Sequence, residues 1–98
     1  MRDPRALAAA YGVRVELADL GDWGATRLIA EYDPDGPTIR INERRLPAAE
    51  HREGVIAFAI AHELYHHREA IGEIARAGGR AAREAAADAY AAVLVSAR

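Results

Sequence analysis

The chain has 98 residues, a formal net charge of −2 and 51% hydrophobic residues, which predicts one domain with a modest core. All 13 basic residues are arginines and 15 acidic residues balance them, so no basic surplus favours nucleic acid as a partner. The absence of cysteine excludes disulfides and thiolate metal sites, and a single serine, Ser96, argues against a serine triad. Histidine, carboxylates, arginine and tyrosine remain, a set suited to hydrolysis assisted by a metal or by carboxylates.

The N-terminal segment predicts a short helix. Asp3 can cap it, and Pro4 fits its first turn, where a backbone N–H is not needed. The alanine-rich stretch 5–11 favours helix, and Gly12 is a good stop signal. The segment lacks the apolar stretch of a signal peptide, and no run approaches the ~18 apolar residues of a membrane span. We therefore expect a soluble cytoplasmic protein without a membrane partner.

Three strands are predicted next. Their signature, alternation of apolar and polar residues, occupies residues 13–17, 27–32 and 38–42. The segment 33–37, Asp-Pro-Asp-Gly-Pro, is a strong turn signal that would join the last two strands as a hairpin. The spacing predicts a small antiparallel three-stranded sheet, with a loop over 19–24 in which Trp23 packs.

The second half of the chain changes to a helical period. Residues 48–70 contain no proline and predict a long helix. Four of its residues share one stripe: Val55, Ala59, His62 and His66. The alanine-rich segment 80–97 predicts a final helix, which the preceding Gly78-Gly79 allows to fold back on the first. The expected fold class is thus α+β, a single compact domain over residues 1–98 with the sheet packed on two helices.

The motif His-Glu-x-x-His, which begins at His62, carries the strongest chemical signal. Residues four apart lie on the same face of a helix, so both imidazoles can reach one ion. Zn²⁺ is bound tetrahedrally by such nitrogens, and Glu63, rotated about 100° from His62, can take a proton from water that the metal activates. The alternative is a helix with surface histidines, which the apolar neighbours Ile60 and Leu64 disfavour.

A catalytic zinc site needs a third protein ligand and an open position for water. His51 lies about three turns before the motif and is too distant, whereas His67 is one position off the ligand face and is expected to be solvated or to support a ligand. Glu84 and Asp88 share a face of the last helix. Glu84 could complete the site, and Asp88 could orient a ligand histidine through its other ring nitrogen. Alternatively, both are solvated acids.

Several nearby residues are weaker candidates. Tyr32, Tyr65 and Tyr90 could stabilise an oxyanion, although such tyrosines more often belong to a core or its rim. Arg80 and Arg83 fit a solvated face better than a clamp for a substrate carboxylate.

Together these motifs resemble the ImmA/IrrE family of zinc metallopeptidases, within the gluzincin group. The matching segments, which follow that family's order, are 11–15, 38–42, 58–66 and 84–92. The chain departs from the family at two positions: Tyr65 replaces the usual glycine before the second histidine, and Ala86 replaces a frequent acidic residue. Tyr65 could narrow access to the metal or simply pack.

The resemblance implies one zinc ion per chain, bound by His62, His66 and Glu84, with Asp88 beside a ligand. It implies a metalloendopeptidase that cleaves a protein substrate, with Glu63 as general base. By family analogy the substrate is a transcriptional regulator. An extended substrate could add to the predicted strand 38–42 if that strand is an exposed edge.

Other functional classes and metals stay open. The chain could be a non-catalytic zinc-binding module for protein interaction, or a helical partner-binding protein without metal. A fourth protein ligand such as His67 or Asp88 would indicate a structural site, and a position left for water would indicate an enzyme. Two histidines and one carboxylate also suit Ni²⁺, Co²⁺ or Cu²⁺.

Overall fold

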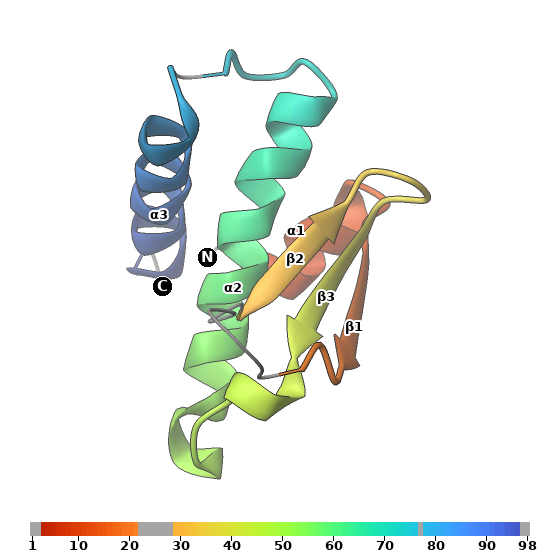
Figure 1. Cartoon of the computed structure of the whole chain (residues 1–98), viewed down its shortest axis with the longest axis vertical. Helices are drawn as coiled ribbons and strands as arrows, with labels where there is room; N and C mark the ends of the chain where they lie inside the picture. The colour runs from red at the N-terminus through yellow and green to blue at the C-terminus, as the bar shows by residue number, and fades with distance from the viewer. Residues whose placement is uncertain (1–2, 22–28, 77, 97–98) are drawn as a thin grey trace.

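The computed structural model describes residues 3–21, 29–76 and 78–96. In these ranges the elements are α1 (Pro4–Ala10), β1 (Arg14–Ala18), β2 (Ala30–Asp33), β3 (Thr38–Asn42), the 3-10 turn η1 (Glu43–Arg45), α2 (Ala49–Ala70) and α3 (Arg80–Ser96). The long helix α2 lies in the middle, with the sheet on one side and α3 on the other (Figure 1). No helix in this part of the chain is both long and apolar enough to cross a membrane.

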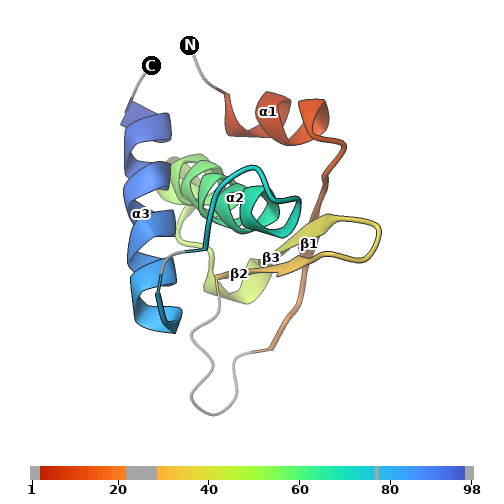
Figure 2. The ribbon, with the colours of Figure 1, turned by 90° about the horizontal axis from the view of Figure 1, so that it is seen from above.

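The N-terminal helix α1 begins and ends where the sequence predicts. The Asp3 side chain accepts a 3.0 Å hydrogen bond from the Arg5 backbone N–H, and Pro4 occupies the first turn. The chain leaves the helix through Gly12, whose φ of +72° is strained for residues with a side chain. This turn lets α1 pack on α2 and lead directly into β1 (Figure 2).

The three-stranded sheet is mixed, with β3 in its centre and the order β1-β3-β2. β2 and β3 form the predicted antiparallel hairpin, in which Tyr32 pairs with Ile39. β1 runs parallel to β3, with Val15 opposite Ile39, so the expected all-antiparallel sheet is wrong for this strand. Alternation of apolar and polar residues indicates which face of the sheet a side chain occupies, but not whether the neighbouring strand runs parallel or antiparallel. The connection 19–29 after β1 is long enough for either direction.

This sheet order also corrects two finer expectations. The central β3 is not an exposed edge, so it cannot receive an added strand; β2 and β1 are the edges of the described sheet. The second strand begins at Ala30, whereas the predicted start at 27 lies outside the described residues, as does Trp23.

Helix α2 is buried on two sides, which explains its weak amphipathic pattern. Toward the sheet, Ile60 and Leu64 are fully buried against Ile39 and Ile41 of β3. On another side, Ala61 packs with the buried residues of α3 that approach it, Ala91 and Leu94. Alanine at this contact allows the two helix backbones to come close. The structure has both predicted helices, at 49–70 and 80–96, whereas the predicted end at 97 lies outside the described residues. Their close packing sets the distance between the polar residues that both helices carry.

Candidate metal centre

Two histidines of α2 and a carboxylate of α3 meet at one point. The rings of His62 and His66 lie 5.1 Å apart between centroids, as expected for residues one turn apart. Glu84 reaches across from α3, with Oε1 3.0 Å from His62 Nε2 and Oε2 2.9 Å from His66 Nε2. One potential ligand atom from each residue lies within 4.8 Å of the others. The structure thus brings together the three residues predicted as ligands.

The other ring nitrogen of each histidine faces a second carboxylate. Asp88 Oδ1 lies 2.7 Å from His62 Nδ1, the position predicted for Asp88. Glu69 Oε1 lies 2.9 Å from His66 Nδ1. An ionised carboxylate can only accept hydrogen bonds, so a proton on each Nδ1 satisfies both contacts. In neutral imidazoles the lone pairs are then on the two Nε2 atoms, which face Glu84.

This donor set fits a cation. His62 Nε2 forms a 3.0 Å hydrogen bond with Glu84 Oε1, so carboxylates flank both ring nitrogens of His62. Each histidine therefore needs a second proton or a cation at Nε2, because a lone pair there would be repelled by the carboxylate of Glu84. His66 Nε2 is buried and has no aligned hydrogen bond, although Glu84 Oε2 is 2.9 Å away. Protons or one metal ion would supply the charge. Two imidazoles and one carboxylate are ligands that Zn²⁺ takes in catalytic sites.

Glu63 lies next to the cluster without belonging to it. Its Oε2 is 3.9 Å from His62 Nε2, and its side chain is 11% exposed. Burial raises the pKa of Glu63 to about 7, the neighbouring Glu84 carboxylate adds to the rise, and His62 opposes it. A carboxyl group with a pKa near neutrality can both take up and release a proton, which is the behaviour that general acid–base chemistry requires.

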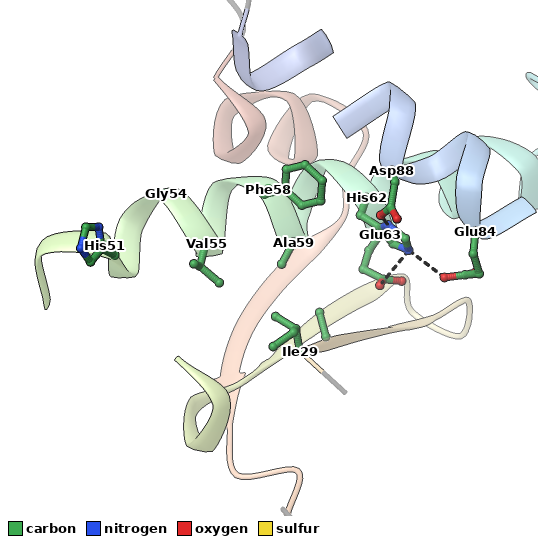
Figure 3. Close-up of a pocket in the computed structure, with 11 residues that line it drawn as sticks. Ile29, His51, Gly54, Val55, Phe58, Ala59, His62, Glu63, Glu84 and Asp88 are labelled. Atoms are coloured by element: carbon green, nitrogen blue, oxygen red, sulfur yellow. Dashed lines mark hydrogen bonds and ion pairs between the residues drawn. The ribbon is translucent and has the colours of Figure 1, made fainter. Parts of the chain in front are cut away.

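A cavity of about 640 Å³ opens beside Glu63, between α2, α3 and the start of β2. Its lining residues are Ile29, Ala30, His51, Gly54, Val55, Phe58, Ala59, His62, Glu63, Glu84 and Asp88. The ionisable side chains of the site gather at one end, His51 lies at the other, and apolar side chains lie between them (Figure 3). The polar cluster therefore faces a space large enough for part of a peptide.

The remaining candidates have other roles. His51 is outside the cluster, as predicted, because it lies at the far end of the cavity. His67 is buried rather than solvated: its Nδ1 is 2.7 Å from the Tyr32 hydroxyl. The expectation that His67 is solvated is therefore wrong. Tyr65 packs its ring against those of His66 and Tyr90, at centroid distances of 6.0 and 5.8 Å.

The arginines before Glu84 differ from each other. Arg80 is exposed, as expected for a solvated face. Arg83 instead binds the buried Glu69 carboxylate at 2.9 Å, so the solvated-face interpretation is wrong for it. Sequence analysis missed Glu69 altogether. The available signal was its position three residues after His66, which places both on one face of α2.

Comparisons with models of protein families, with curated proteins and with solved structures found no match. The resemblance drawn from the motifs therefore stays a prediction.

Proposed function

We propose that the protein is a zinc-dependent peptidase that hydrolyses peptide bonds of a protein substrate. The observation that carries this proposal is the convergence of His62, His66 and Glu84 at the polar end of the cavity, with Glu63 beside them. By the family resemblance, the substrate is a transcriptional regulator.

His62 and His66 would hold the metal through Nε2, and Glu84 through its carboxylate. A zinc ion bound there would polarise the scissile carbonyl and acidify a water molecule. The hydrogen bonds of Asp88 and Glu69 keep the two Nδ1 atoms protonated and so aim Nε2 at the site. Ni²⁺, Co²⁺ or Cu²⁺ would fit the same donor types.

Glu63 would move the proton. Its carboxylate takes a proton from the attacking water and delivers it to the leaving amine, which restores the starting carboxylate. Its burial at the cavity wall supports this role, because a shielded carboxylate with a pKa near 7 is a stronger base than an exposed one.

The edge strand β2 would position the substrate. Ala30, its first residue, lines the cavity, so an extended peptide added along this edge would run past the polar cluster. Edge pairing supplies main-chain hydrogen bonds that do not depend on substrate sequence.

The positions of two further residues support an enzyme over a non-catalytic zinc module. His67 turns its Nδ1 to Tyr32, and Asp88 turns Oδ1 to the outer nitrogen of His62. Neither residue is in the group of potential ligand atoms found among the described residues, so three residues, His62, His66 and Glu84, would hold the ion, the number of protein ligands in catalytic zinc sites.

Substitution Glu63→Gln tests the proposal. We expect this variant to bind zinc like the wild type, because Glu63 is not a ligand, and to lose cleavage by at least about 100-fold, because it lacks a base. The assay counts new N-termini released from unfolded casein by zinc-loaded protein. The matched control is Glu53→Gln, an exposed glutamate of the same helix, which should cleave normally. Equal cleavage by Glu63→Gln would refute the base assignment.

A further inference from the structure

Glu69 is the most deeply buried carboxylate beside the candidate metal centre. Its side chain is 0% exposed, whereas that of Asp88, the corresponding partner of His62, is 62% exposed. A buried carboxylate is costly unless hydrogen bonds and opposite charge compensate it. The groups that compensate the buried Glu69 carboxylate, Arg83 and His66, indicate its role.

Arg83 supplies the opposite charge from the other helix. It donates from Nη2 to Glu69 Oε1 at 2.9 Å and from Nε to Oε2 at 3.3 Å, so both carboxylate oxygens are held. A guanidinium carries only donors, so both oxygens of Glu69 act as acceptors in this contact.

The acceptor role of Glu69 fixes the protonation of His66. His66 forms its aligned hydrogen bond through Nδ1, 2.9 Å from Glu69 Oε1, and has none at Nε2 although Glu84 Oε2 is 2.9 Å away, which favours the proton on Nδ1. The lone pair of the neutral ring then lies on Nε2, the atom that faces Glu84. The contact also holds the ring in its plane, because the carboxylate itself is clamped at both oxygens.

We infer that Glu69, which Arg83 holds at both carboxylate oxygens, is a positioning residue: it orients the His66 ring and keeps Nε2 free to bind a metal ion. Arg83 directly precedes Glu84, so the same ion pair that orients one ligand also ties the segment carrying another to α2. One buried contact between two helices therefore aligns two of the three ligands before any ion arrives. This inference rests on the proposed metal site.

The first test reads the proton directly in metal-free protein. Two-bond ¹H–¹⁵N correlation spectra at about pH 8.5, two pH units above the ordinary imidazole pKa, should show His66 protonated at Nδ1. In Glu69→Ala the proton should shift toward Nε2, because its acceptor is gone. An unprotonated Nδ1 on His66 of the wild-type protein would overturn the inference. This spectrum needs no metal. The wild-type spectrum tests the protonation of His66 even if the Glu69→Ala variant does not fold.

The second test measures Zn²⁺ affinity by competition with a chromogenic chelator. We expect about 100-fold weaker binding in Glu69→Ala and about 10-fold in Glu69→Gln, because the amide oxygen of glutamine can still accept from Nδ1. Glu73→Gln is the matched control. Glu73 is also paired with an arginine, Arg68, but contacts Tyr11 rather than a candidate ligand, and its loss should leave zinc affinity unchanged.

The two proposals fail in different ways. A wild-type protein that binds no zinc would refute the metal site itself. A wild-type protein that binds one zinc ion per chain, together with Glu69→Ala of equal affinity, would refute the positioning role alone.

Discussion

At the scale of single residues, His67 shows how a polar side chain next to a candidate ligand is kept out of the site. Burial lowers the pKa of His67 and raises the pKa of Tyr32, so both groups are neutral. The Tyr32 hydroxyl and Nδ1 of His67 share a hydrogen bond of 2.7 Å. The ring of Tyr11 packs edge-on to the same imidazole, 5.6 Å away between centroids.

Substitution Tyr32→Phe should lower the free energy of unfolding by about 1–3 kcal/mol, because it leaves a buried imidazole nitrogen without a partner. Urea denaturation measures this change. Tyr11→Phe is the control: it removes a hydroxyl that contacts the exposed Glu73, and its effect should stay below about 1 kcal/mol. Equal losses in the two variants would show that the hydroxyl of Tyr32 has no special role.

At the scale of elements, two glycines with open surroundings have opposite roles. Gly36 turns the β2–β3 hairpin with a φ of +58°, whereas Gly54 lies within α2 at an ordinary helical conformation. An added Cβ would meet nothing within 4 Å at either position. Backbone preference alone therefore decides the effect of alanine at each.

We expect Gly36→Ala to destabilise the protein by about 1–2 kcal/mol, the cost of a left-handed conformation for a residue with a Cβ. Gly54→Ala should stabilise it by about 0.5–1 kcal/mol, because alanine favours helix more than glycine does. Urea unfolding of both variants checks the signs. A stabilised Gly36→Ala would contradict the turn assignment.

The elements themselves could be predicted where local signals suffice. Asp3 and Pro4 define the start of α1, and the turn at 33–37 defines the hairpin, because caps and turns act between near neighbours in sequence. The parallel partner of β1 could not be predicted, since the side chains of Val15 and Leu17 alternate alike beside either kind of neighbour.

At the scale of the whole molecule, α3 is held to α2 by few apolar groups. Ala87, Ala91 and Leu94 are its buried residues, and they offer little surface to the hydrophobic effect. The polar contacts of Glu84 and Arg83 with α2 add to this packing. The candidate metal centre thus lies at the junction of the two helices, and binding of an ion would strengthen that junction.

The centre could be predicted only in part from sequence. His62 and His66 follow from helical spacing within one element, and the spacing of Glu84 and Asp88 placed them on one face of another. Glu69 was missed because a charged residue on a helix is ordinarily exposed. Its burial depends on Arg83 arriving from α3, which is a tertiary event.

The central claim is that one metal ion binds between His62, His66 and Glu84. Elemental analysis of protein purified without chelator and exposed to excess Zn²⁺, then dialysed, tests it most directly. We predict one zinc per chain in the wild type and in His51→Ala, whose side chain lies at the far end of the cavity, and none in His62→Ala or Glu84→Ala. A wild type without zinc, or either ligand variant that retains a full equivalent, would contradict the account.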